Sequence, residues 1–246
     1  MIKIVLLRHG QSVWNEKGLF TGWVDVDLTS LGEKEAKLAG RKLKKGGFKF
    51  DLVFQSFLKR SQKTTKVVLN ELKEKKTKVE KDWRLNERHY GALQGMDKKE
   101  MVKKYGEDQV FVWRRSYDIR PPKIKAGSKY DQSRLVKYKN IPVPLAESLK
   151  DVEKRVAIFW EKIVRPALKA GNKILISASG NSLRALVKHL DKIATDKIAD
   201  LNIPTALPLV YELDNNFKPI RHYYLASAKE LAKAEATVKN QIKVRK

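Results

Sequence analysis

Continuous apolar runs alternate with amphipathic segments along this chain, and this alternation strongly limits the folds open to it. Buried strands are predicted at residues 2–7, 50–56, 173–179 and 208–213, with a shorter strand at 77–83. Between them, helical spacing of apolar residues predicts helices at 30–47, 58–74, 98–117 and 147–171. Strands that alternate with helices predict an α/β fold, with a mostly parallel sheet and helices on both faces.

The length of the chain is compatible with one large domain. Its 246 residues are enough to bury a full core, and 42% of them are hydrophobic. Because no internal repeat or linker divides the sequence, we predict a single domain over residues 1–246. Within it, we interpret residues 120–146 as a long, basic, proline-punctuated loop, and residues from about 226 to 246 as a polar, mobile tail.

The sequence lacks the usual marks of a secreted or membrane protein. It has no cysteine, which excludes disulfides and thiolate chemistry and suits a reducing compartment. No apolar run approaches the ~20 residues of a membrane-spanning helix. The apolar start, MIKIVLLRHG, is too short for a signal peptide and lacks a cleavage site. We therefore expect a cytoplasmic protein with no membrane partner.

The net charge of +25 raises the question of a polyanionic partner. The excess is mostly lysine and is spread along the chain, and no zinc-finger spacing or aromatic RNA-binding pattern accompanies it. We therefore expect no specific nucleic-acid partner. A lysine-rich surface and the steering of a small anionic substrate remain the two interpretations of the charge.

The polar residues that follow the strands indicate where a ligand would bind. In an open parallel sheet the ligand lies at the carboxyl ends of the strands. His9 follows Arg8 there, and an imidazole nitrogen can attack phosphorus to form a phosphohistidine. Arg8 and Arg60 could neutralise phosphate oxygens, with Asn15, Thr21 and the backbone N–H of Gly22 as neutral donors. A buried histidine with a purely structural role is the alternative for His9.

Two further stretches are rich in functional side chains. WRLNERHYGALQG (83–95) holds one carboxylate, Glu87, which could exchange a proton with a substrate hydroxyl or simply pair with a neighbouring arginine. WRRSY (113–117) holds Arg114 and Arg115. With Lys98 they could bind a substrate carboxylate and a second phosphate, or they could form a solvated helix face.

Five segments together resemble the cofactor-dependent phosphoglycerate mutases of the histidine phosphatase superfamily. They are LLRHGQSVWNEKGLFTGWVDVDLTSLGEKEA, WRLNERHYGALQG, VWRRSYD, GNSLRALVKHL and LNIPTALPLVYELD. They occur in the order typical of the family and cover residues from about 3 to 225. RHG alone points only to the superfamily, whereas NERHYG together with WRRSYD points to the mutases.

The resemblance implies a role for each matched residue. His9 would be the phosphorylated nucleophile and Glu87 the proton donor and acceptor. The phosphate and carboxylate pocket would be lined by Arg8, Asn15, Thr21, Gly22, Arg60, Arg88, His89, Tyr90, Lys98, Arg114, Arg115, Gly180 and Asn181.

The resemblance also implies an activity and its requirements. The family interconverts 3-phosphoglycerate and 2-phosphoglycerate, with 2,3-bisphosphoglycerate as the primer that phosphorylates the histidine, and it uses no metal. The expected ligands are therefore small phosphorylated three-carbon acids, and the expected assembly is a homodimer or homotetramer. The tail of these proteins tends to fold over the site, so the basic C-terminal end is a candidate lid.

The sequence departs from the family pattern at Ser179, where the family has a second histidine. That histidine donates a hydrogen bond to the transferring phosphoryl group, and losing one such donor typically costs a factor of about 10²–10³ in rate. We therefore expect an impaired mutase. The open alternatives are a degenerate paralogue that binds phosphorylated ligands without turnover, and a phosphatase in which water resolves the phosphohistidine. A smaller departure is Ala206, which replaces a glycine in a tight turn.

Overall fold

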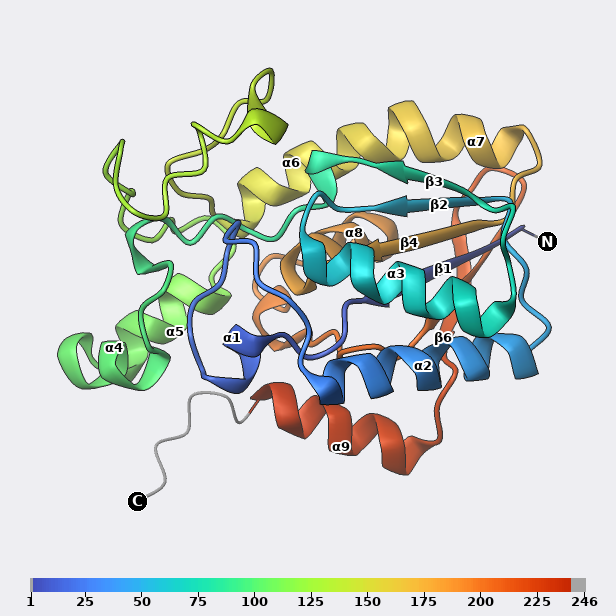
Figure 1. Cartoon of the computed structure of the whole chain (residues 1–246), viewed down its shortest axis with the longest axis horizontal. Helices are drawn as coiled ribbons and strands as arrows, with labels where there is room; N and C mark the ends of the chain where they lie inside the picture. The colour runs from blue at the N-terminus through green and yellow to red at the C-terminus, as the bar shows by residue number, and fades with distance from the viewer. Residues whose placement is uncertain (1, 240–246) are drawn as a thin grey trace.

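Six strands form one sheet in the order β3–β2–β4–β1–β5–β6 (Figure 1). The computed structural model describes residues 2–239. The strands are β1 (Ile2–Arg8), β2 (Leu52–Gln55), β3 (Lys78–Lys81), β4 (Ile174–Ala178), β5 (Leu209–Leu213) and β6 (Pro219–Tyr224). β3, β2, β4 and β1 run parallel, whereas β5 is antiparallel to both β1 and β6. The predicted mostly parallel α/β fold is confirmed.

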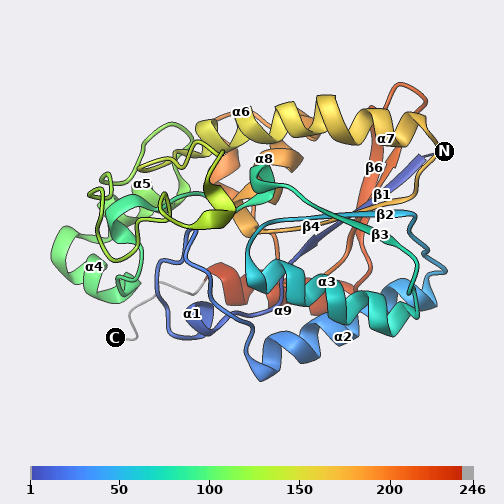
Figure 2. The same cartoon turned by 45° about the horizontal axis from the view of Figure 1, so that its top comes forward.

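Helices cover both faces of this sheet. They are α1 (Val13–Glu16), α2 (Ser30–Lys45), α3 (Lys59–Leu72), α4 (Lys98–Tyr105), α5 (Glu107–Arg115), α6 (Leu149–Phe159), α7 (Arg165–Lys169), α8 (Gly180–Asp191) and α9 (Ala228–Lys239). Two views show α2 and α3 on one face and α6, α7 and α8 on the other (Figures 1 and 2). A π-helical turn at Trp160–Val164 joins α6 to α7, so the long helix predicted at 147–171 is nearly continuous.

Burial on both faces explains why the first strand is apolar throughout. Alternate side chains of a strand point to opposite sides of the sheet. Ile4 and Leu6 accordingly pack in the core beneath α6 and α8, whereas Val5 and Leu7 pack in the core beneath α2 and α3. All four are at most 1% exposed. A strand with only one covered face would alternate apolar and polar residues instead.

The carboxyl ends of the parallel strands face a region that contains little regular secondary structure. The chain from Trp83 to Ser148 lies at this end and includes α4 and α5 (Figure 1). The basic segment at 120–146 contains no α-helix or strand. It is nevertheless anchored, because the hydroxyl of buried Tyr138 accepts a hydrogen bond from Asn86 at 3.2 Å.

The C-terminal part of the chain contains more structure than its sequence suggested. The predicted strand at 208–213 is antiparallel, and it pairs with β6, which was not predicted. β6 is an edge strand with exposed polar positions, so it lacks the apolar run that marks an interior strand. Residues 228–239 of the predicted tail form α9, and Lys42 on α2 pairs with Glu230 there at 3.0 Å. Residues 240–246 of that tail lie outside the described residues.

Within residues 2–239, no helix is both long and apolar enough to span a membrane.

Candidate active site

His9 lies at the carboxyl end of β1, where its backbone N–H donates to the carbonyl of Ala178 on β4. The side chain is 2% exposed. Nδ1 lies 2.7 Å from the carbonyl oxygen of Gly10, which can only accept, so this nitrogen carries the proton. Nε2 accepts from the Nε–H of Arg60 at 3.1 Å. The lone pair of Nε2 therefore points at Arg60, and both side chains border the same cavity.

The environment keeps this imidazole neutral. Burial, then the charges of Arg60 and Arg8, hold the pKa of His9 well below its usual value of 6.5. A neutral imidazole retains the lone pair that a nucleophile needs. The neutral form of His9 is therefore suited to act as a nucleophile once Arg60 releases Nε2.

Two arginines border the same side of the cavity as His9. Arg60, at the start of α3, donates to the carbonyls of Gly22 and Val24 at 2.9 and 3.0 Å. Arg8 donates one Nη–H to the carbonyl of Ile203 at 2.6 Å, while its buried Nε–H has no partner within residues 2–239. The turn at Gly22 has a φ of +55°, and a Cβ there would stand 2.2 Å from the Gln94 side chain. Glycine is therefore required at this position.

Glu87 is the one acidic residue that borders the cavity within the described part of the chain. Its Oε1 accepts from the backbone N–H groups of Arg88 and Asn181, at 2.8 and 3.1 Å. Asn181 belongs to the first turn of α8, where the helix dipole stabilises a negative charge. Both of these hydrogen bonds to the Glu87 carboxylate come from backbone N–H groups. The geometry therefore does not support the alternative that Glu87 only pairs with an arginine side chain. The Glu87 side chain borders the cavity.

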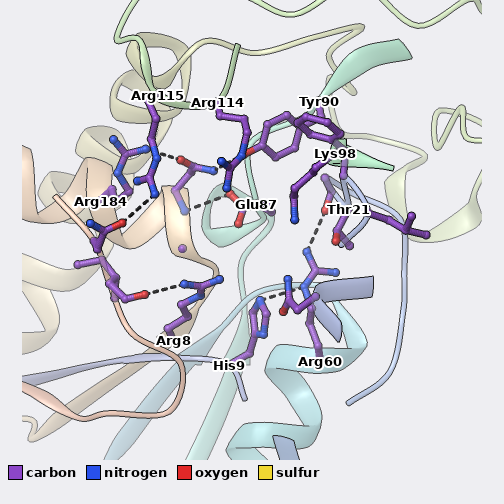
Figure 3. A pocket seen from close by; sticks show the side chains of 18 residues that line it. Arg8, His9, Thr21, Arg60, Glu87, Tyr90, Lys98, Arg114, Arg115 and Arg184 are labelled. Atoms are coloured by element: carbon purple, nitrogen blue, oxygen red, sulfur yellow. Dashed lines mark hydrogen bonds between the residues drawn. The ribbon is translucent and has the colours of Figure 1, made fainter. Parts of the chain in front are cut away.

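A second group of basic side chains lies across the cavity from His9. Figure 3 shows Arg8, His9 and Arg60 on one side, with Lys98, Arg114 and Arg115 opposite them. Lys98 begins α4, and the two arginines end α5. Burial, then the charges of Arg114 and Arg8, lowers the pKa of Lys98 to about 7. Burial likewise lowers the pKa of Arg114 to about 10. With Arg184, six basic side chains border the cavity, which makes it an anion site.

We predict that anion affinity falls as the pH rises through 7, because Lys98 loses its proton there. Sulfate is a suitable probe, since its charge is constant over this range. Its dissociation constant, measured by calorimetry between pH 6 and 9, should rise by at most about tenfold per pH unit above the lysine pKa. The Lys98→Arg variant keeps its charge and should flatten the profile. A flat profile in the unmodified protein would contradict this assignment.

Most of the residues predicted to line the pocket do border this cavity. They are Arg8, His9, Asn15, Thr21, Gly22, Arg60, Glu87, Tyr90, Lys98, Arg114, Arg115, Gly180 and Asn181. Asn181 also links two parts of the wall, because its Nδ2 donates to the hydroxyl of Tyr90 at 3.2 Å. Arg88 and His89 do not border it, and for these two the prediction of direct lining is corrected. Ser179, which stands at the position of the family's second histidine, does not border it either.

Arg88 and His89 point away from the cavity because Glu87 and Tyr90 on either side of them face it. Arg88 is fully buried and donates to the backbone carbonyls of Trp113 and Arg114, so it supports the end of α5. The Nε2 of His89 donates to Gln132 at 3.0 Å and holds the 120–146 loop against the core. Both residues therefore support the wall of the site from behind.

Ser179 is the residue before α8 and is fully buried. Its backbone N–H donates to the side chain of Ser182 at 3.1 Å. Its own hydroxyl oxygen has no hydrogen-bond partner among the described residues. The serine therefore supplies neither a charge nor a directed donor to the cavity.

The cavity also includes residues that sequence reasoning did not assign to it: Leu19, Phe20, Arg184, Asn202 and Ile203. Arg184 and Asn202 lie within segments that carry the family resemblance, which was the available signal. Arg184 is on a helix, and its position one turn after Asn181 puts both side chains on the same face. Asn202 lies in a segment without a regular repeat, so only the tertiary structure brings it to the site.

Arg155 on α6 fixes the backbone that carries Glu87. It donates to the carbonyl of Glu87 at 3.0 Å and pairs with the carboxylate of Glu147 at 2.8 Å, both side chains being at most 7% exposed. Trp23 donates to the same Glu87 carbonyl at 2.6 Å. These contacts fix the place of the carboxylate without touching it.

Replacing Arg155 with methionine should lower the free energy of unfolding by about 3–5 kcal/mol, because Glu147 would remain buried and unpaired. Chemical denaturation would measure the change. The double variant Arg155→Met/Glu147→Gln should recover part of the loss, since it removes the uncompensated charge. Equal stability of the single and double variants would show that the charge is not the cause.

Comparison with known proteins identifies the family of this chain and shows which solved structures share its fold. The model of the histidine phosphatase superfamily (branch 1) matches residues 4–224. A mycobacterial glucosyl-3-phosphoglycerate phosphatase superposes with a TM-score of 0.70 at 21% identity, over 92% of this chain and 99% of its own. The alpha-ribazole phosphatase of Shigella flexneri gives a TM-score of 0.65 at 20% identity, over 89% and 95%. At such identities these structures show a shared fold. The extent of the family match, with His9 and its arginines at the strand ends, shows that the chain belongs to the histidine phosphatase superfamily, branch 1.

Proposed function

We propose that this protein is a phosphoglycerate mutase, which interconverts 3-phosphoglycerate and 2-phosphoglycerate through a phosphohistidine at His9. The observation that carries the proposal is the presence of basic groups on two sides of one cavity. Arg8 and Arg60 lie beside the His9 nucleophile, and Lys98, Arg114 and Arg115 lie opposite. This arrangement favours a small ligand with two anionic groups, such as a phosphate and a carboxylate.

The transfer step follows from these positions. With phosphohistidine at Nε2, the N–P bond breaks as a substrate hydroxyl oxygen bonds to phosphorus, and Glu87 accepts the hydroxyl proton. In the second half, His9 takes the other phosphoryl group, and Glu87 returns the proton to the oxygen that leaves. Arg8 and Arg60 neutralise the phosphoryl oxygens in both halves. The Arg60 Nε–H, which donates a hydrogen bond to His9 in this structure, would donate to the phosphoryl group instead.

The cavity also fits the primer that the family uses. 2,3-Bisphosphoglycerate would supply the phosphoryl group that loads His9. Its two phosphates and carboxylate suit a cavity to which the described residues contribute six basic side chains and one carboxylate. Asn15, Thr21 and Tyr90 border the same space and offer neutral donors. Because Ser179 supplies no donor, we propose that turnover is slow.

The test is to incubate the protein with 3-phosphoglycerate and 2,3-bisphosphoglycerate and to separate the products. Formation of 2-phosphoglycerate would support the mutase. Release of inorganic phosphate without isomerisation would replace it with a phosphatase. Binding without any product and without labelled His9 would indicate a degenerate paralogue that only binds phosphorylated ligands.

A further inference from the structure

The segment from Ile198 to Ile203 contacts three of the arginines that border the cavity. The carbonyl of Ile198 accepts from Arg184 at 2.7 Å, and the carbonyl of Ile203 accepts from Arg8 at 2.6 Å. Between them, the side-chain oxygen of Asn202 accepts from Arg115 at 2.8 Å. One short segment therefore fixes guanidinium groups that come from β1, α5 and α8.

All of these acceptors are neutral oxygens. Three arginines outside the cavity wall are held by carboxylates instead: Arg155 pairs with Glu147, Arg120 with Asp151, and Arg84 with Asp82. A carboxylate would orient a cavity arginine equally well, but it would cancel the charge that attracts an anion. Carbonyl and amide oxygens fix the planar guanidinium and leave its full charge for the ligand.

Asn202 is the one side chain among these acceptors on the segment, so it can be changed without altering the backbone. Its Oδ1 accepts from Arg115, and its Nδ2 donates to the carbonyl of Asp200 at 3.0 Å. The second bond fixes the amide so that the oxygen, and not the nitrogen, faces Arg115. Arg115 is thereby held at the side of the cavity opposite His9.

We propose that Ile198–Ile203 is a positioning element that orients cavity arginines through neutral acceptor oxygens, and that Asn202 is the positioning residue through which Arg115 recognises the second anionic group of the ligand. The proposal rests on the proposed function only in taking the ligand to carry two anionic groups. It predicts that Asn202 controls selectivity for such ligands over a single phosphate, which binds beside His9.

The experiment compares the dissociation constants of inorganic phosphate and 3-phosphoglycerate in three variants by calorimetry. Asn202→Asp keeps an oxygen beside Arg115 but cancels its charge, and Asn202→Leu keeps the size but removes the acceptor. Both should weaken 3-phosphoglycerate binding by about 10- to 100-fold and leave the phosphate constant within about twofold. Asn215→Asp, at an exposed turn, adds the same charge away from the cavity and should change neither.

Several results would overturn the proposal. One is an unchanged ratio of the two dissociation constants in both Asn202 variants. Another is equal weakening of both ligands together with a lower melting temperature, which would indicate a merely structural role. A third is an unmodified protein that binds 3-phosphoglycerate no more tightly than phosphate. The mutase proposal is judged separately, by whether 2-phosphoglycerate forms, so the two can fail independently.

Discussion

Replacing His9 with alanine is expected to lower phosphoryl transfer by on the order of 10⁴–10⁶-fold, because the proposed covalent intermediate forms on this imidazole. Arg8, Arg60 and Glu87 would remain, so ligand binding should persist while turnover is lost. The measurement is incorporation of label from radiolabelled 2,3-bisphosphoglycerate, together with the rate of product formation. The label should be lost in acid and retained in alkali, as expected of a phosphohistidine.

His189→Gln is the matched control for this variant. His189 lies on α8 with 30% of its side chain exposed, facing Glu161 and not the cavity. Labelling and turnover should therefore be unchanged. Thermal denaturation of His9→Ala would exclude loss of the fold as the cause. Labelling that persists in His9→Ala would place the nucleophile elsewhere and remove the basis of the proposed mechanism.

Replacing Ser179 with histidine is expected to raise the rate of phosphoryl transfer by about 10²–10³-fold. The resemblance to the mutases implies a second histidine at this position, and the serine hydroxyl has no hydrogen-bond partner within residues 2–239. The next residue, Gly180, borders the cavity, and a Cβ built there would stand 3.3 Å from the guanidinium carbon of Arg8. The resemblance implies that an imidazole at residue 179 would add a hydrogen-bond donor to the transferring phosphoryl group. Isomerisation rates of the two proteins, measured side by side, test this.

Ser179→Ala is the control that separates a missing donor from a useful hydroxyl. Because that hydroxyl has no partner, its removal should change the rate by no more than about twofold and should not lower stability. A large loss in Ser179→Ala would show that the serine takes part in catalysis. No gain in Ser179→His, despite a labelled His9, would show that the limit on turnover lies elsewhere in the cavity.

The elements that could be predicted are the buried ones, because their burial requires a recognisable pattern of apolar residues. β1, β2 and β4 are continuous apolar runs because helices cover both faces, and their order with the helices implies a parallel sheet. β6 and α9 were missed because they lie at the edge and the surface, where polar residues are tolerated and the apolar pattern is weak. Ala206 was recognised as unusual, and it does adopt a φ of +47°.

The candidate site also contains residues that the sequence could assign and residues that it could not. His9, Arg8 and Arg60 could be assigned because strand ends in a parallel sheet converge at one edge, whatever the details of packing. Arg88 and His89 were misplaced because the direction of consecutive side chains in an irregular segment depends on its local backbone. No sequence pattern specifies that backbone, which here is fixed by Trp23 and Arg155 binding the carbonyl of Glu87.

The sequence by itself therefore determined the α/β class, the edge of the sheet where the cavity lies, and a candidate nucleophile, His9, flanked by arginines. These follow from local rules of periodicity and strand direction. Only the tertiary structure decided that Asn202 and Arg184 join the cavity, that the hydroxyl of Ser179 is left without a partner, and that Arg8, Arg115 and Arg184 are held by neutral oxygens. Those features depend on contacts between residues up to 195 positions apart. Such contacts produce no periodic pattern in the sequence from which they could be predicted.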